Sequence, residues 1–171
     1  MTNNSLVIRN ATIVDGTGAD PFKGDVALEN GIIKEVGTVE NNYNDEIDAK
    51  GLILAPGFID IHTHFDPQLC WDGYATPSIE HGVTTVVTGN CSLSLAPIRN
   101  GGEEKIISMF QVIEDIKKPT FDAAVPFSWE TFGEYLDHIK PSLGINVGAL
   151  IGHSAVRLYV MGEDSQKRKA T

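Results

Sequence analysis

Cysteine, positive charge and long apolar runs are all scarce in this chain of 171 residues. Its 13 Lys and Arg stand against 23 Asp and Glu, a formal net charge of -10. No sequence-independent attraction to nucleic-acid phosphates or anionic membranes is therefore expected. No apolar run approaches the ~18 residues that a membrane helix needs, and the start of the chain has neither a basic leader nor an apolar signal block. We expect a cytoplasmic protein with no nucleic-acid partner and no membrane partner.

The two cysteines, Cys70 and Cys91, are too few for a disulfide scaffold. Each is instead a candidate for thiol chemistry or metal binding. Cys70 lies in a Leu-Cys-Trp segment away from the predicted strand ends, and we expect it to pack against apolar neighbours. Cys91 is placed differently, because it directly follows a predicted strand.

The first third of the chain consists of short extended segments. Leu6–Val14 is rich in apolar and β-branched residues and ends at a Gly-rich turn. Val26–Glu29 and Ile32–Val36 flank Asn30-Gly31, which is the strongest short hairpin signal because both turn residues tolerate a positive φ. Extended character returns at residues 52–54 and is broken by the Pro-Gly pair that follows. A small antiparallel sheet is therefore predicted around this hairpin, within a first region of residues 1–55.

From residue 56 onward, apolar strands alternate with helical patterns, which is typical of βα units with parallel strands. The fold class is therefore α/β. The predicted strands are Phe58–His62, Val83–Thr88 and Ile145–Ile151. The predicted helices are a short one from Pro77 to Gly82, one over Glu103–Lys118 stopped by Pro119, one capped by Ser128 and reaching Ile139, and the start of another in Glu163–Thr171.

Acidic and imidazole side chains gather at the end of the first parallel strand. Asp60, His62 and His64 occupy alternate positions, so in a continuous strand all three project from one face, while Ile59 and Ile61 pack on the other. Two imidazoles about 7 Å apart at the backbone can lean onto one divalent metal ion. An isolated His-X-His more often simply finishes a strand. Here it stands where α/β barrels place their active sites, so we predict two metal ligands, with Asp60 coordinating or supporting them.

Further candidates follow the next two predicted strands. Cys91 comes after Val83–Thr88, so its sulfur emerges at the same end of the sheet as the histidines, and a thiolate is a strong zinc ligand. The alternative for a free cysteine is a small buried apolar residue. His153 follows the third strand and is a candidate to face the site, with Arg157 one turn further on. A purely structural role fits these last two equally well.

The same residues resemble a known family. The segments Ala55–His64 and Gly82–Cys91, together with 121–129, 134–136 and Asn146–His153, are similar to the N-acyl-D-amino-acid deacylases (D-aminoacylases) of the amidohydrolase superfamily. The Gly-Asn-Cys that ends the second segment resembles the D-aminoacylase branch, in which a cysteine replaces a bridging carboxylated lysine. The resemblance runs over nearly the whole chain.

This resemblance implies a zinc-dependent hydrolase that splits the amide bond of N-acyl-D-amino acids, small-molecule substrates, with His62, His64 and Cys91 as zinc ligands. It implies that residues 1–55 form part of a small β-sandwich and that 56–171 begin a TIM-like (β/α)₈ barrel. The family's two further histidine ligands, and the aspartate that acts as general base, are expected beyond residue 171. A closed barrel needs about 250 residues, so the chain looks truncated and we predict little or no deacylase activity from it alone.

Two other interpretations fit part of this pattern. Cyclic amidohydrolases such as dihydroorotase and hydantoinase share the His-X-His, although Cys91 argues against them. A non-catalytic metal-binding fragment that works as it stands is the other alternative.

Overall fold

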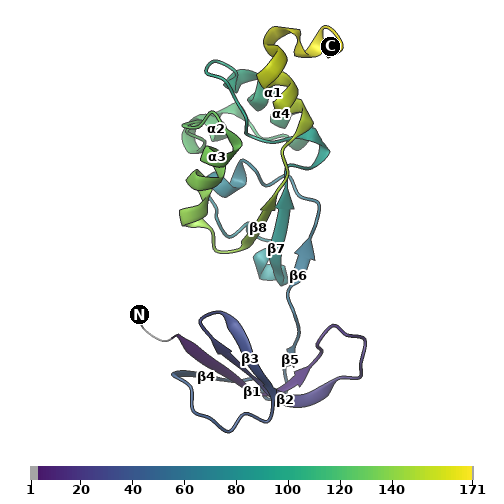
Figure 1. Cartoon of the computed structure of the whole chain (residues 1–171), viewed down its shortest axis with the longest axis vertical. Helices are drawn as coiled ribbons and strands as arrows, with labels where there is room; N and C mark the ends of the chain where they lie inside the picture. Colours follow the sequence, from purple (N-terminus) through teal and green to yellow (C-terminus); the bar gives the residue numbers. More distant parts are fainter. Residues whose placement is uncertain (1–3, 171) are drawn as a thin grey trace. The chain divides into compact units, whose positions relative to one another are not determined.

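The computed structural model describes residues 4–170 and divides the chain into two compact units, Met1–Pro56 and Gly57–Thr171. The first unit is a sheet, whereas the second combines strands with helices (Figure 1). No helix in the described part of the chain is long and apolar enough to cross a membrane.

The first unit is a five-stranded mixed sheet (Figure 1). Antiparallel pairs join β1 to β2 and β2 to β3, whereas β4 and β5 both run parallel to β1. Asn30 and Gly31 connect β2 to β3 with φ angles of 49° and 79°, so the predicted hairpin is confirmed. The strands are β1 (Ser5–Ile13), β2 (Phe22–Glu29), β3 (Ile32–Gly37), β4 (Asp45–Asp48) and β5 (Ile53–Leu54).

Asp25 stabilises an irregularity in this sheet. The register of β1 against β2 shifts around Asn10, which has a positive φ of 61°. The Asp25 carboxylate accepts the backbone N–H of Asn10 at 2.9 Å and that of Val39 at 3.4 Å, and Arg9 lies 3.3 Å away. These hydrogen bonds, the one from Asn10 foremost, lower the pKa of Asp25 because they favour its charged form.

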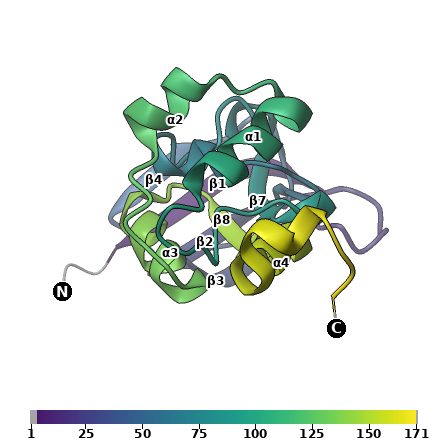
Figure 2. The same ribbon diagram turned by 90° about the horizontal axis from the view of Figure 1, so that it is seen from above.

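The second unit is built on a three-stranded parallel sheet in the order β6-β7-β8. One buried apolar cluster joins β7 to all four α-helices, and Phe110, Phe121 and Tyr135 are among its fully buried side chains. Figure 2 shows the helices spread around β7 and β8. The elements are β6 (Phe58–Asp60), β7 (Val83–Thr88), β8 (Asn146–Ala149), α1 (Glu103–Glu114), α2 (Lys118–Ala124), α3 (Phe132–Ile139), α4 (His153–Met161) and the 3₁₀ turns η1 (Gln68–Cys70), η2 (Ile79–His81), η3 (Asn90–Ser92), η4 (Lys140–Ser142) and η5 (Gly162–Gln166).

One long predicted helix is in fact two. The prediction that Glu103–Lys118 is continuous and stopped by Pro119 is wrong, because α1 ends at Glu114, where Asp115 takes a left-handed φ of 54°. Pro119 then lies in the first turn of α2. Proline suits that position, since the first N–H groups of a helix have no partner within the helix.

The cap of α3 also differs from the prediction. Thr131, not Ser128, is the N-cap: its hydroxyl accepts the backbone N–H of Glu134, and the Glu134 carboxylate accepts the N–H of Thr131. This reciprocal pair is a capping box, which satisfies two backbone donors at once. The Thr-X-X-Glu pattern in the sequence was the better signal.

The carboxyl ends of two strands come earlier than predicted. β6 ends at Asp60 rather than His62, and β8 at Ala149 rather than Ile151. Helix α4, which the sequence pattern did not predict, follows β8 almost at once. The helix predicted over 163–171 is instead the short turn η5 within the described residues, because Gly162, with a φ of 56°, ends α4 and redirects the chain. Residue 171 lies outside the described residues.

Candidate metal centre

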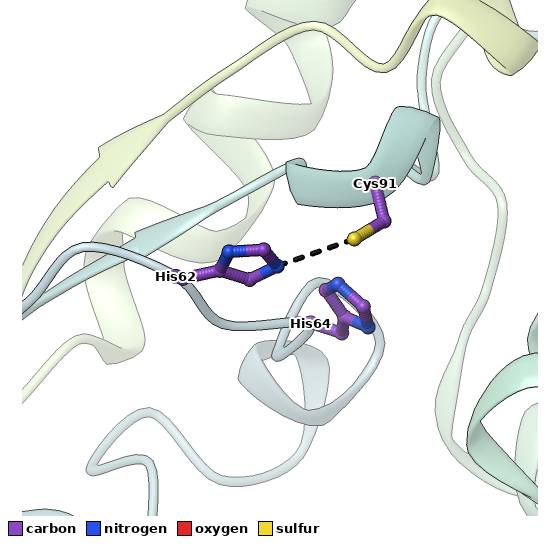
Figure 3. Close-up of side chains that lie close together, drawn as sticks. All are labelled: His62, His64 and Cys91. Atoms are coloured by element: carbon purple, nitrogen blue, oxygen red, sulfur yellow. Dashed lines mark hydrogen bonds between the residues drawn. The ribbon is translucent and has the colours of Figure 1, made fainter.

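Three potential metal ligands converge beyond the carboxyl ends of β6 and β7. Ligand atoms of His62, His64 and Cys91 all lie within 4.8 Å of one another. The Nε2 atom of His62 is 3.2 Å from Sγ of Cys91, and Figure 3 shows both imidazole rings beside the sulfur. A tetrahedral zinc ion, with bonds of about 2.0–2.3 Å, holds its ligand atoms roughly 3.3–3.6 Å apart. The three side chains are thus close to the spacing that one ion requires.

The histidines reach this position from a loop, not from a strand. The prediction that Asp60, His62 and His64 share one strand face is wrong, because β6 ends at Asp60. The Asp60 carboxylate accepts the backbone N–H of His62 at 3.1 Å and so helps to turn the chain away from the strand. Asp60 does not belong to the cluster of potential ligands found in the described residues.

Ile59 and Ile61, which were predicted to pack on the opposite face, are 65% and 72% exposed. The physical reason is that β6 is the edge strand of the described sheet and has β7 as its only neighbour there. The chain stays bonded to β7 after the strand ends, because the backbone N–H and the hydroxyl of Thr63 both donate to the carbonyl of Val87, at 3.0 and 2.9 Å.

Cys91 is presented by a tight left-handed turn after β7. Gly89 has a φ of 78°, and a Cβ at that position would lie 1.9 Å from the carbonyl oxygen of Leu150, so only glycine fits. Cys91 and Ser92 follow with φ angles of 51° and 70°. Such conformations are uncommon for residues with a side chain and cost on the order of 1–3 kcal/mol each. The thiol that this turn presents is exposed.

The side-chain amide of Asn90 ties the cysteine turn to the histidine loop. Its Nδ2 donates to the carbonyl of Val87 at 2.9 Å and lies 3.4 Å from the carbonyls of both Ile61 and Thr63. Ile61 and Thr63 are the residues directly before and after His62 in the chain. The Asn90 amide therefore helps to set the separation between the cysteine and the histidines.

Asp66, which the sequence reasoning did not single out, is a second tie between the same loops. It is only 1% exposed, and its Oδ2 accepts the backbone N–H of Gly89 at 3.0 Å. Burial raises the pKa of Asp66 to about 7. Its other oxygen, Oδ1, is buried without a hydrogen-bond partner. The only signal in the sequence was a carboxylate two residues after the His-X-His.

Glu114 is the other residue that sequence reasoning missed. Its Oε1 contacts Nδ1 of His64, while Nε2 of the same ring is buried and has no hydrogen-bond partner. One imidazole nitrogen is thus engaged by a carboxylate, and the other is available to a ligand. Fifty residues separate the two side chains, so no local pattern linked them.

The structure does not bring His153 or Arg157 into the cluster of potential ligands in residues 4–170. His153 is the exposed first residue of α4. Arg157 instead donates from Nε to the carbonyl of Ser165 at 2.5 Å and from a second nitrogen to the carbonyl of Arg168. Its guanidinium therefore fastens the segment after α4.

Cys70 packs against the apolar core, as expected. Burial raises the pKa of its thiol to about 12. Cys70 is therefore half-buried in an apolar setting, whereas Cys91 is exposed and lies beside the imidazoles of His62 and His64.

Comparisons with known proteins place this arrangement in context. The Amidohydrolase family model matches residues 45–171. Over 168 residues the chain is 36% identical to N-acyl-D-aspartate deacylase of Alcaligenes xylosoxydans xylosoxydans, which covers 97% of this chain and 31% of that protein. A solved D-aminoacylase structure is similar with a TM-score of 0.77 and 33% identity, covering 97% of this chain and 33% of that one.

A solved N-acyl-D-glutamate deacylase from Bordetella bronchiseptica, complexed with zinc and a phosphonate inhibitor, is similar with a TM-score of 0.68 and 30% identity. It covers 92% of this chain and 31% of that one. The chain spans less than a third of the length of the curated relatives it matches, 31% in the case of the N-acyl-D-aspartate deacylase. Its mixed α/β fold matches the corresponding part of the D-aminoacylase structure.

Proposed function

The chain belongs to the Amidohydrolase family, and we propose that it carries the metal-binding part of a zinc-dependent deacylase that hydrolyses the amide bond of N-acyl-D-amino acids. The convergence of His62, His64 and Cys91 beyond two parallel strands carries this proposal. The similarity to N-acyl-D-aspartate deacylase and D-aminoacylase supports the substrate class.

The donor set fits zinc. Two imidazoles and one thiolate are ligands of the kind that structural and catalytic zinc sites use. The Nε2 atom of His64 is buried and has no hydrogen-bond partner, which is consistent with a nitrogen that binds a metal ion. Zinc bound at such a site acts as a Lewis acid toward a carbonyl and makes water nucleophilic near neutral pH. The similar N-acyl-D-glutamate deacylase contains zinc.

The residues around the proposed zinc site have two different roles. His62, His64 and Cys91 are the proposed ligands, while Asn90 and Asp66 fix the distance between the loops that carry them. Amide hydrolysis also needs a group that moves a proton from water to the leaving amine. We propose that this group is an aspartate outside residues 1–171, since the chain spans 31% of the aspartate deacylase.

The architecture that we propose follows from the same comparison. Residues 1–55 would contribute to a small β-sandwich, and β6, β7 and β8 would be the first strands of a (β/α)₈ barrel. Exposed apolar side chains on the edge strand β6 support the barrel, because Phe58 is 69% and Ile59 is 65% exposed. The acidic composition supports a cytoplasmic location. A closed barrel has eight strands, so we expect little or no turnover from the chain assayed alone.

Zinc affinity tests the site directly. The purified chain is expected to compete with a chromophoric chelator for one zinc ion, and the variants Cys91→Ala and His62→Ala are expected to lose most of that affinity. His81→Ala is the matched control, since His81 is exposed in η2, before the opposite end of β7. If Cys91→Ala binds zinc as tightly as the unmodified chain, the proposed ligand set is wrong.

A chimera tests the activity. Residues 1–171 replace the matching part of the related N-acyl-D-aspartate deacylase, and the product is assayed for release of amino acid from N-acetyl-D-aspartate. We expect turnover that requires zinc and disappears in the Cys91→Ala chimera, with the L-enantiomer as substrate control. A folded, zinc-loaded chimera that hydrolyses dihydroorotate or a hydantoin but no N-acyl-D-amino acid would instead support a cyclic amidohydrolase.

A further inference from the structure

We propose that Glu114 is a positioning residue that orients His64 for metal binding. This inference rests on the proposed zinc site and concerns a side chain that is far from the ligands in the sequence but contacts one of them in space. In the neutral tautomer with its proton on Nδ1, His64 donates to the Glu114 carboxylate that it contacts and keeps the lone pair of the unpartnered Nε2 for a metal ion. A metal ion needs that lone pair, because only an unprotonated imidazole nitrogen coordinates.

The surroundings of the contact support a specific role. Glu114 lines the same 260 Å³ cavity as Asp60, His62 and His64. The side chains of His64 and Glu114 are 17% and 30% exposed, so the contact between them is partly shielded from water. A ring nitrogen buried without a partner costs free energy, and the Nε2 of His64 is such an atom. A metal ion bound to Nε2 would remove this cost.

The fold holds Glu114 firmly at this place. It is the last residue of α1, and the three preceding turns bury Ile106, Ile107 and Phe110 in the core. The ring of Phe110 packs against that of Phe121 with centroids 5.9 Å apart. Directly after Glu114 the chain turns away through a left-handed residue. An anchored backbone limits the positions that the carboxylate can reach, which is what a positioning group requires.

Carboxylates commonly accept the second N–H of a zinc-bound histidine, where they fix the tautomer and raise the basicity of the ring. Removing such a partner weakens metal binding by about 10–100-fold. An ordinary half-exposed ion pair would instead contribute little to metal affinity. The two roles therefore differ in a measurable quantity.

Two readouts test the role of Glu114 in the 171-residue chain. In metal-free protein labelled with ¹⁵N-histidine, the nitrogen shifts are expected to show His64 with its proton on Nδ1, and Glu114→Ala is expected to move it toward Nε2. In a chelator competition, Glu114→Ala is expected to raise the zinc Kd by about 10–100-fold. Glu114→Gln, which keeps an accepting oxygen, is expected to show a smaller loss.

Glu104→Ala is the matched control, because Glu104 is on the same helix and pairs at the surface with Lys118. It is expected to change neither readout. If Glu114→Ala and Glu114→Gln, both folded by circular dichroism, retain the tautomer and the zinc Kd of the unmodified chain, the positioning role is wrong. If His64→Ala itself leaves zinc affinity unchanged, the proposed zinc site fails instead, while the tautomer measurement still reports on the Glu114 contact.

Discussion

Asn90→Ala should weaken zinc binding without removing any ligand. The Asn90 amide makes one good hydrogen bond, 2.9 Å to Val87, and two longer ones to Ile61 and Thr63. A hydrogen bond of this kind contributes about 0.5–1.5 kcal/mol net. The two N–H groups of the amide share three acceptors, two of them at 3.4 Å, so we take about 1–2 kcal/mol for the whole group. They oppose the backbone cost of the left-handed turn at Cys91.

Without the amide, the turn can relax and carry the thiol away from the histidines. If the whole 1–2 kcal/mol goes into holding the loops in the metal-binding arrangement, the zinc Kd rises by about 5–30-fold. Chelator competition at fixed pH measures this change, and a urea titration of the metal-free chain measures the accompanying loss of stability.

Asn146→Ala is the matched control for this prediction. The Asn146 amide also donates to a carbonyl of β7, that of Thr84, at 2.9 Å, but near the amino end of the strand, away from Cys91. It should lower stability without changing the zinc Kd. Equal zinc affinity in Asn90→Ala and the unmodified chain, or an equal loss in both variants, would refute the reasoning.

Three other predictions concern the remaining structure. The pKa of Asp25 is lowered in the folded chain. Its stabilising effect is therefore full above the unfolded pKa of about 3.9 and is lost as the pH falls through the folded value. Asp25→Asn should be less stable than the unmodified chain in urea at pH 7, and the difference in stability should close at about pH 2–3. Iodoacetamide should modify the exposed Cys91 rapidly, but Cys70, whose pKa is raised to about 12, only on unfolding. Equal labelling of both cysteines in the folded chain, measured by mass spectrometry, would contradict this. Thr131→Ala removes the hydroxyl of the capping box and should cost about 1 kcal/mol in urea unfolding, whereas Ser128→Ala should be neutral.

The fold was predictable where one short segment determines its own conformation. Asn30 and Gly31 adopt the positive φ angles that the hairpin turn demands, and the β-branched run Val83–Thr88 forms a strand with those bounds. The predictions failed where two signals competed. Pro119 stops one helix or starts another depending on the residues before it, and the left-handed Asp115 decided the matter.

The candidate ligands were predictable for a related reason. Parallel strands bring their carboxyl ends to one edge of a sheet, so residues that directly follow β6 and β7 come near one another. This is why His62, His64 and Cys91 converge although the continuous strand assumed for the histidines is wrong. His153, after β8, did not join them, because α4 begins there at once.

The supporting groups were not predictable, because each depends on packing between distant segments. Asp66 reaches Gly89 across 23 residues and Glu114 reaches His64 across 50, and neither spacing forms a pattern along the chain. Short sequence motifs thus identify the candidate ligands, whereas the positions of their side chains also depend on the end of α1 and on the turn at Asn90. Since all of these residues belong to the unit Gly57–Thr171, zinc that binds only the folded site stabilises that unit, by about 2.7 kcal/mol at a free concentration of 100 times the Kd.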